Sequence, residues 1–258
     1  MDLGLKGKAV LIAGASKGIG AATARLMAQE GARLALAARD PDALAALAGS
    51  LAGEAKAIAA DFTEASSGEA AVRRAIQALG RLDVLVISIG AAQGGLFWEL
   101  DEAVWETAFA LKFMGMVRLL RAAAPVMKAQ GSGSIIVVVG NNGRQPHPRM
   151  LPGSSANAAC LAVLKGLSEE LAPHGVRVNA VSPGPTRTGR WDTLMTNLSA
   201  GSGRSVEDEE ADQLARIPTG RANAPEEIAR LIAMFASELA PGLTGANLTC
   251  DGGATKAL

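Results

Sequence analysis

Short apolar runs alternate with longer segments of helical periodicity along most of the chain. Each run is rich in Val, Ile, Leu and Ala, which is typical of strands buried on both faces of a parallel sheet. The runs predict strands at residues 8–13, 33–38, 56–60, 84–88, 134–139, 177–182 and 247–250. The longer segments predict helices at residues 18–30, 41–51, 66–79, 102–130, 154–172 and 225–236. This alternation predicts an α/β fold in which a doubly wound, seven-stranded parallel sheet carries helices on both faces.

One long segment, residues 189–210, shows no clear period and contains three glycines, three serines and an acidic run at residues 207–210. An irregular segment of this length in a compact domain is usually functional or disordered. Because it directly follows the sixth predicted strand, whose carboxyl end should face the binding crevice, we interpret it as a substrate lid rather than a disordered loop. The acidic run itself is interpreted as the solvated start of a helix.

Length and composition place these elements in one domain. Folds of this kind commonly reach 258 residues, so we expect residues 1–258 to form a single unit around one sheet. Charged residues make up 19% of the chain, below the roughly 25% of an average soluble domain, so much of the chain should be buried. The formal net charge is 0, which disfavours nucleic acid and anionic membranes as partners and favours a small molecule.

Three further features bear on location and chemistry. The amino terminus lacks the apolar stretch of a signal peptide, and no segment approaches the roughly 20 apolar residues that span a bilayer, so we expect a cytoplasmic protein without membrane contact. Cys160 and Cys250 lack metal-ligand spacing, so we expect free thiols and no metal site. The chain contains no tyrosine, which excludes any mechanism that depends on a phenol.

A glycine-rich loop follows the first predicted strand and opens an alanine-rich helix. Glycines allow a tight turn and close backbone approach, and the helix N-terminus supplies unpaired N–H groups and a positive dipole, as the phosphates of a dinucleotide require. The order of strand, loop and helix makes this signal much stronger than isolated glycines. The candidate cofactor residues of the loop are Gly14, Ser16, Lys17, Gly18, Ile19 and Gly20.

The spacing of these glycines resembles the short-chain dehydrogenase/reductase family, and matching segments extend along nearly the whole chain. They are Asp61 after the third strand and residues 82–86, 177–184 and 251–253. The resemblance implies a Rossmann-type domain and a homo-oligomer, usually a tetramer formed through the fourth and fifth helices and the last strand. It also implies that Asp61 contacts adenine and that residues 183–188 hold the nicotinamide carboxamide, with Thr188 as a donor. The other cofactor residues that it implies are Phe62, Gly90, Pro183, Gly184 and Thr186.

Charge near the second strand bears on the choice of cofactor. Ala38 stands where an NAD-preferring sequence would carry Asp to match a free ribose diol. Arg39 follows it, and Lys17 lies in the glycine loop, so two cations could meet a 2'-phosphate. We therefore expect NADP(H) to be preferred over NAD(H). The alternative is that both residues are ordinary exposed cations.

The residues that perform catalysis in most members of this family are replaced here. The family places Tyr and Lys four residues apart at the start of the fifth helix, Ser before them and Asn on the fourth helix. Aligning this chain without a gap from residues 177–179 puts Gly153 and Asn157 at the Tyr and Lys positions. Gly140 then falls at the Ser position and Lys112 at the Asn position. All four positions are changed, and neither Gly153 nor Asn157 can replace the original chemistry.

Lys112 is the most suggestive replacement, because it lies in an otherwise apolar stretch of helix. A desolvated ammonium has a lowered pKa and can donate a proton. We hypothesise that Lys112 donates to a substrate oxygen, supported by Asn141, Asn142 and Asn157. The alternative is that Lys112 fills space, contacts ribose or extends to solvent. His147, in a loop between prolines, is interpreted as an exposed bystander.

Three functions remain open. The first is an NADP(H)-dependent oxidoreductase acting on a carbonyl or hydroxyl group, and the nucleotide site favours it because hydride chemistry belongs to the cofactor. The second is a catalytically silent nucleotide-binding or regulatory protein, which the loss of all four catalytic side chains favours. The third is a non-redox reaction, such as dehydration or carbon–carbon cleavage, on the same fold.

Overall fold

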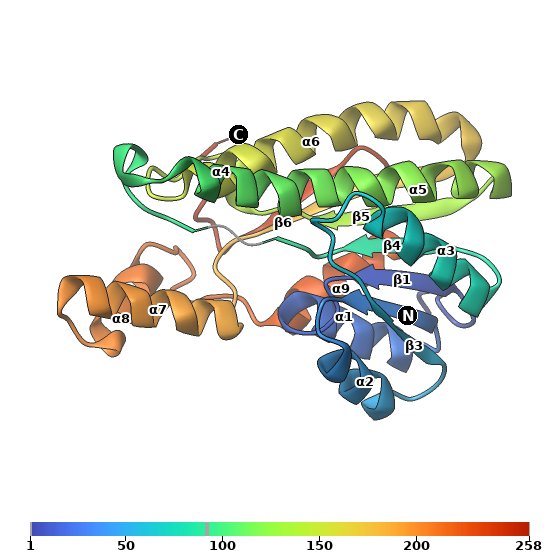
Figure 1. Ribbon diagram of the computed structural model, residues 1–258, viewed down its shortest axis with the longest axis horizontal. Coiled ribbons are helices and arrows are strands. Elements are labelled where there is room, and N and C mark those ends of the chain that lie inside the picture. Colours follow the sequence, from blue (N-terminus) through green and yellow to red (C-terminus); the bar gives the residue numbers. More distant parts are fainter. Residues whose placement is uncertain (1, 91–92, 258) are drawn as a thin grey trace.

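The computed structural model describes residues 2–90 and 93–257, so that Met1 and Leu258, the ends of the predicted domain, lie outside the described residues. Its core is one parallel sheet of seven strands in the order β3-β2-β1-β4-β5-β6-β7 (Figure 1). The strands are β1 (Ala9–Ala13), β2 (Arg33–Ala38), β3 (Ala55–Ala59), β4 (Val84–Ile87), β5 (Gly133–Val138), β6 (Val176–Pro183) and β7 (Asn247–Cys250). The predicted doubly wound Rossmann-type fold is confirmed, with strand bounds that differ by at most one residue at each end.

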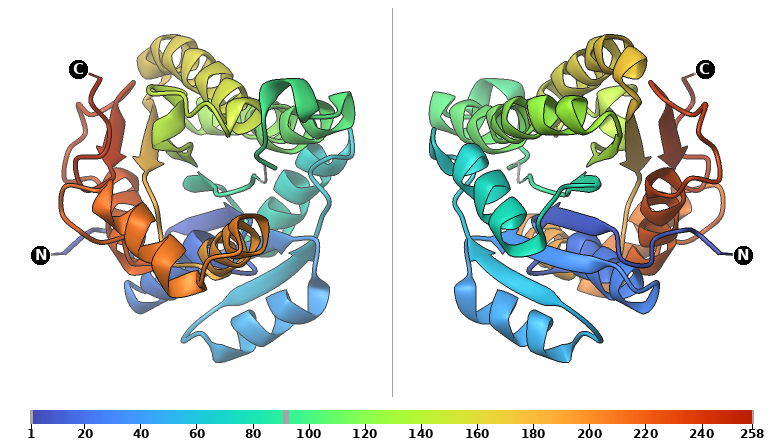
Figure 2. Two further views of the ribbon diagram at one scale, coloured as in Figure 1. Left: turned by 90° about the vertical axis from the view of Figure 1, so that its left-hand side faces the viewer. Right: turned by 90° about the vertical axis from the view of Figure 1, so that its right-hand side faces the viewer.

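Helices cover both faces of the sheet (Figure 2). One face packs against α1 (Gly18–Gln29), α2 (Pro41–Ser50) and α9 (Pro225–Ala236), and the other against α3 (Ser67–Leu79), α5 (Gly115–Gln130) and α6 (Leu151–Leu171). Neighbouring strand residues point to opposite faces, so Leu11 and Leu85 belong to the core under α5, whereas Val10 and Ile12 belong to the core under α1. Both faces are therefore buried, which explains the continuous apolar runs.

The predicted helix at residues 102–130 is interrupted. It begins as α4 (Glu102–Ala108), passes through a π-helical turn, η2 (Phe109–Met114), and continues as α5. Gly115 lets the helix approach the sheet closely, because a Cβ there would lie 2.9 Å from Cδ1 of Ile89 and 3.1 Å from the carbonyl oxygen of Phe62. Wide turns of this kind occur often at functional sites. Lys112 lies within this one.

The prediction that residues 189–210 are irregular is wrong. The segment forms α7 (Gly189–Ser202) and the first half of α8 (Val206–Ala215), two helices that project from the body of the molecule (Figure 1). Trp191 is buried and its indole Nε1 donates to Oε1 of Glu210 at 3.2 Å, which holds the two helices together. The acidic run does begin a helix, capped by Ser205. However, Glu209 is 7% exposed and is therefore not solvated.

The start of α9 provides a pH-dependent stabilising contact. Glu227 accepts hydrogen bonds from Arg221 and from the backbone N–H of Ala224, each at 2.7 Å. These bonds, chiefly those from Arg221, lower the pKa of Glu227 from 4.5 to about 2. The stabilisation is therefore complete above about pH 4.5 and is lost as the pH falls towards 2.

We expect Glu227→Gln to melt at a lower temperature than the wild type at pH 7, because the amide cannot replace both charged bonds. The difference should narrow as the pH is lowered, since the wild type then loses the same contact. Thermal unfolding monitored by circular dichroism between pH 7 and pH 3 measures this. Glu226→Gln is the matched control on an exposed neighbour, and equal melting temperatures for both variants would contradict the prediction.

Candidate active site

The glycine loop lies where the order of strands reverses, between β1 and β4, which is the usual crevice for ligands in doubly wound sheets. Gly14 has a φ of +85°, and a Cβ there would collide with the carbonyl oxygen of Ser88. A Cβ at Gly20 would collide with the carbonyl oxygen of Gly14. Lys17, the N-cap residue of α1, makes no capping hydrogen bond with its side chain. The loop is therefore a tight backbone cradle that leaves the first N–H groups of α1 open to an anion.

The predicted cofactor residues with side chains form the rim of this cradle. Lys17 and Arg39 are exposed, and Ser16 and Ile19 are half-buried. Oδ1 of Asp61 accepts hydrogen bonds from the N–H of Thr63 at 2.9 Å and from its hydroxyl at 2.8 Å. These bonds lower the pKa of Asp61, and the charge of Arg39 adds to the effect. Arg39 therefore lies near Asp61, at the end of the cleft where the resemblance places adenosine.

The segment after β6 closes the other side of the cradle. A Cβ at Gly18 would stand 3.2 Å from Cγ2 of Thr188, so Thr188 packs directly onto the glycine loop. Gly184 packs against Asp251, and the hydroxyl of Thr186 donates to the carbonyl of Gly184 at 2.9 Å.

Two other predicted cofactor residues lie further from the loop. Pro183 is the last residue of β6. Phe62 turns its ring into the core and is only 3% exposed, so its backbone is the part that remains near the cleft.

Lys112 points from the π-helical turn to the carboxyl ends of two strands. Its Nζ donates to the carbonyl oxygen of Ile89 at 3.1 Å and to that of Val138 at 2.5 Å. Burial lowers the pKa of Lys112 to about 8; Cys160 opposes this shift and the positive charge of Arg190 adds to it. The side chain is partly buried. The ammonium is thus held at the carboxyl end of the central strands. Two of its three N–H groups bind these carbonyls, and one remains free.

The three asparagines near the fifth strand do not all face Lys112. Asn157 is buried, and a Cβ at Gly140 would stand only 2.8 Å from its Nδ2, so this amide fills the space beside Gly140. Asn141 instead donates from Nδ2 to Oδ2 of Asp251 at 3.2 Å. Asn142 lies in the following 3-10 turn, half-buried. The structure therefore brings Asn157 to the end of β5 and ties Asn141 to the carboxyl-terminal segment.

Arg190 is a residue of this region that we did not predict from the sequence. Its Nη1 donates to the carbonyl oxygen of Gly90 at 3.2 Å, so the first turn of α7 reaches across to the loop after β4. The signal that could have found it is its position two residues after Thr188, just beyond the recognised segment 183–188.

His147 is exposed, as predicted. Its Nδ1 accepts a hydrogen bond from the N–H of Arg149 at 3.2 Å. Burial, Arg216 and Arg149 lower its pKa, so His147 is neutral at pH 7.

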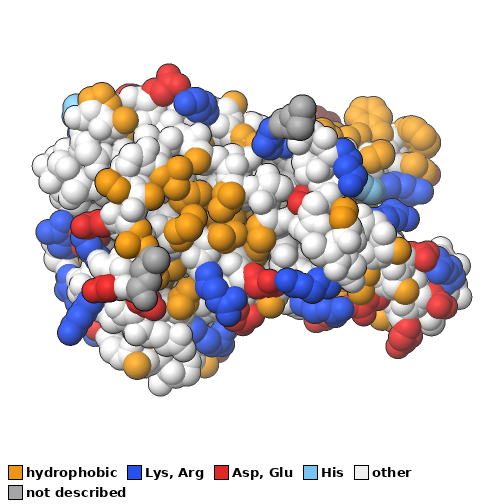
Figure 3. Space-filling view, turned by 180° about the vertical axis from the view of Figure 1, so that it is seen from behind, with side chains coloured by type: hydrophobic (Ala, Val, Ile, Leu, Met, Phe, Trp, Pro, Cys, Tyr) orange, Lys and Arg blue, Asp and Glu red, His pale blue; other side chains and the backbone are white. Residues whose placement is uncertain are grey.

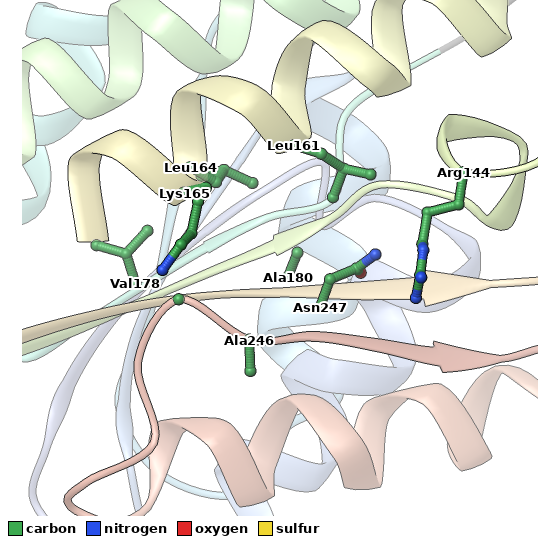
Figure 4. Close-up of a pocket in the computed structure, with 9 residues that line it drawn as sticks. Arg144, Leu161, Leu164, Lys165, Val178, Ala180, Ala246 and Asn247 are labelled. Atoms are coloured by element: carbon green, nitrogen blue, oxygen red, sulfur yellow. The ribbon is translucent and has the colours of Figure 1, made fainter. Parts of the chain in front are cut away.

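A separate hollow of about 510 Å³ lies between α6 and strands β6 and β7 (Figure 4). Leu161, Leu164 and Val178 give it apolar walls, and Arg144 and Lys165 stand near its two ends. None of the candidate cofactor residues lines it. The hollow is therefore separate from the crevice at β1 and β4, where the resemblance would place a dinucleotide.

Comparison with known proteins identifies the family. A family model described as enoyl-(acyl carrier protein) reductase matches residues 14–255. The 2,3-dihydro-2,3-dihydroxybenzoate dehydrogenase of Bacillus subtilis (strain 168) is 32% identical over 255 residues, which cover 98% of this chain and 97% of the relative. The chain is a short-chain dehydrogenase/reductase.

Two further relatives of this short-chain dehydrogenase/reductase are reductases. The 3-oxoacyl-(acyl-carrier-protein) reductase FabG of Thermotoga maritima is 32% identical over 252 residues, 96% of this chain and 98% of the relative. The crystal structure of L-sorbose reductase from Gluconobacter frateurii, complexed with NADPH and L-sorbose, superposes with a TM-score of 0.94 at 30% identity and 100% coverage of both chains. The chain is therefore an oxidoreductase of this family in sequence and in fold.

Two kinds of feature are absent from the residues that the structure describes. None of the helices within residues 2–90 and 93–257 has the length and apolar character needed to cross a membrane. The same part of the chain holds no group of three His, Cys, Asp or Glu side chains arranged to bind a metal ion.

Proposed function

We propose that this protein is an NADP(H)-dependent oxidoreductase that acts on a carbonyl or hydroxyl group of a small molecule with a non-standard set of catalytic residues. The observation that carries the proposal is the backbone cradle at Gly14 and Gly20, where any side chain would collide with a backbone carbonyl oxygen, so that only glycine allows this close approach of the chain. The cradle opens towards the ends of β4 and β5, where Lys112 and Asn157 lie. A bound nicotinamide would supply or accept the hydride.

Lys112 is the proton donor in this proposal, in place of the family's Tyr. Its ammonium is held by the carbonyls of Ile89 and Val138, which fix the nitrogen without neutralising it. When a carbonyl substrate is reduced, the oxygen gains negative charge and takes a proton from Nζ, leaving a neutral amine. Asn157 would orient the substrate oxygen with its amide. Asn141, fixed by Asp251, would complete the wall of the site.

The cofactor preference rests on Lys17 and Arg39. Both side chains are exposed at the rim of the cradle, and Ala38 supplies no carboxylate to a free ribose. The complex of the related L-sorbose reductase with NADPH supports the same choice. A guanidinium forms two charge-assisted hydrogen bonds with a phosphate, so Arg39 should contribute most of the discrimination.

We expect Arg39→Asp to lower the affinity for NADPH about tenfold or more, which corresponds to about 1.4 kcal/mol, and to raise the affinity for NADH. The introduced carboxylate would repel the 2'-phosphate and accept hydrogen bonds from a ribose diol. Fluorescence titration with each nucleotide measures both effects. Arg25→Asp, an equal charge change on the exposed side of α1, is the control. Unchanged NADPH affinity in Arg39→Asp would leave Arg39 an ordinary surface cation.

We propose that the substrate enters beneath α7 and α8, and that residues 189–210, although helical, act as the substrate lid. Their start contacts the cradle through Thr188 and the loop after β4 through Arg190. Gly140 and Gly153 are small residues at the family's Ser and Tyr positions, so the pocket beside the nicotinamide would be wide.

A homotetramer formed through α5, α6 and β7, working in the cytoplasm, completes the proposal. β7 is an edge strand, and unpaired edges invite pairing with another chain. The face of the molecule on which β7 lies carries a cluster of hydrophobic side chains near its centre (Figures 2 and 3). Leu239, just before β7, is 47% exposed. A second copy would cover this surface and the hollow between α6 and β7.

The second candidate function is a catalytically silent nucleotide-binding protein. It is favoured by the bonds from Lys112 to two backbone carbonyls, because a purely structural lysine would make the same contacts. Oxidation of NADPH in the presence of a panel of aldehydes and ketones separates the two. Turnover of any member supports the enzyme. NADPH binding without turnover of any member supports the silent protein, and binding of neither nucleotide would overturn both.

A further inference from the structure

Two cations flank Gly90 without a carboxylate partner. Lys112 lies against its Cα, since a Cβ there would stand 2.9 Å from Cδ and 3.6 Å from Nζ of the lysine. Arg190 binds the carbonyl oxygen of the same residue from the opposite element, α7. Within the described residues, no carboxylate oxygen lies within 4.0 Å of either side chain's nitrogens, because neither takes part in any ion pair of that part of the chain.

Two other arginines close to α7 do have carboxylate partners. Arg187, three residues before Arg190, pairs with Glu210 at 2.6 Å, and Arg204 at the far end of α7 pairs with Asp212 at 2.5 Å. The helical lobe therefore supplies carboxylates to Arg187 and Arg204. Of Arg187, Arg190 and Arg204, only Arg190 has a backbone carbonyl and no carboxylate as its partner.

Leaving two like charges together in a partly desolvated cleft is unfavourable. Burial lowers the pKa of Arg190, although much of its side chain still reaches solvent at the mouth of the cleft. The charge of Arg190 also lowers the pKa of Lys112, which shows that the two repel each other. An anion bound by Arg190 would offset this repulsion and accept charge-assisted hydrogen bonds from the guanidinium.

We propose that Arg190 binds a carboxylate of the substrate beside Gly90, where the positive charge of Lys112 adds attraction while the one free N–H of Lys112 serves the substrate's carbonyl oxygen. The inference rests on the proposed oxidoreductase function and narrows its substrate to carbonyl compounds that also carry a carboxylate. Arg190 would anchor the anionic group from the lid side. The planar guanidinium matches a carboxylate in two parallel bonds, which would also fix the substrate's orientation relative to Lys112. The pyrophosphate of the dinucleotide offers the same anionic chemistry, and the test separates the two sources.

The first arm of the test measures the cofactor. NADPH is titrated by fluorescence into the wild type, Arg190→Gln and Arg230→Gln, a control on the exposed side of α9. If Arg190 serves the substrate, Arg190→Gln keeps the wild-type affinity within about threefold. A loss of about tenfold or more, absent from the control, would instead assign the guanidinium to the pyrophosphate and overturn the substrate assignment.

The second arm measures the substrate anion directly. Pyruvate, acetoacetate and 4-formylbenzoate are titrated by calorimetry into the protein saturated with NADP⁺. The methyl ester of each acid is titrated separately in the same way for comparison. The proposal expects at least one acid to bind about tenfold more tightly than its ester, and expects Arg190→Gln to abolish that preference but Arg230→Gln to keep it. No preference for any acid, or a preference that survives in Arg190→Gln, would overturn it.

Failure of this carboxylate site and failure of the proposed function give different results. Binding is read without turnover, so a catalytically silent protein can still show the preference for acids. If neither nucleotide binds, the oxidoreductase proposal fails, and the same titrations on the protein without nucleotide still decide whether Arg190 holds an anion.

Discussion

Replacing Lys112 by methionine should lower the rate of carbonyl reduction about 100-fold or more at pH 7, while leaving NADPH binding intact. Methionine matches the length of the apolar stem but carries no proton, and general acid catalysis commonly contributes this much. Steady-state oxidation of NADPH with any substrate found in the carbonyl panel measures the effect. Lys128→Met, on the exposed end of α5, is the matched control and should retain the wild-type rate.

The pH dependence of the wild type gives the same prediction a second readout. Lys112 donates only in its charged form, and its pKa is lowered to about 8. The rate of reduction should therefore be constant below about pH 7 and fall as the pH rises through 8. Lys112→Met should lose this dependence. A rate in Lys112→Met equal to that of Lys128→Met would mean that Lys112 only fills the gap between β4 and β5.

Gly14→Ala should destabilise the protein by about 3 kcal/mol or more and abolish dinucleotide binding. The φ of +85° at this position disfavours any L side chain, and the new methyl group would overlap the carbonyl oxygen of Ser88. That oxygen belongs to the backbone after β4, so the overlap can be relieved only by moving the loop. Chemical denaturation and NADPH titration measure the two losses.

The control for this prediction is Gly166→Ala within α6. A Cβ at Gly166 would meet nothing within 4 Å, and its φ is negative. Alanine also favours the helix, so this variant should gain about 0.5–1 kcal/mol. If Gly14→Ala is as stable as Gly166→Ala, the crevice does not depend on the close approach of β1 to the loop after β4.

Much of the fold could be predicted because the strands are buried on both faces. A strand such as Ala9–Ala13 is then apolar throughout, so its first and last residues can be predicted from the apolar run. The failure at residues 189–210 came from reading Gly203 and several serines as a loop. The opposing signals were present in the sequence: Trp191 and Met195 are both buried four residues apart, and Ser205 is a helix N-cap. The exposed surface of α7 hides this period, since most of its residues are polar or small.

The site could be predicted only in part. The glycine cradle has a sequence signature because its geometry requires glycine itself. Lys112 donates to the backbone carbonyls of Ile89 and Val138. Every residue has a backbone carbonyl, so the sequence contains no residue-specific signal for these contacts. Asn141 and Asp251 lie 110 residues apart and meet only through the folded sheet. The π-helical turn that aims Lys112 likewise depends on close packing at Gly115, which the periodicity of the helix does not reveal.

The position of Asp251 would connect an assembly formed through β7 with the proposed site. This residue directly follows the edge strand β7 and, besides holding Asn141, accepts hydrogen bonds from the N–H groups of Gly253 and Thr255. Any force that shifts the sheet edge therefore reaches the loop after β5 through one residue and one hydrogen bond. In an assembly that pairs β7 with a neighbouring copy, ligand binding in one subunit could shift β7 and so change the site of the next subunit. Ligand binding to such an assembly would then be cooperative.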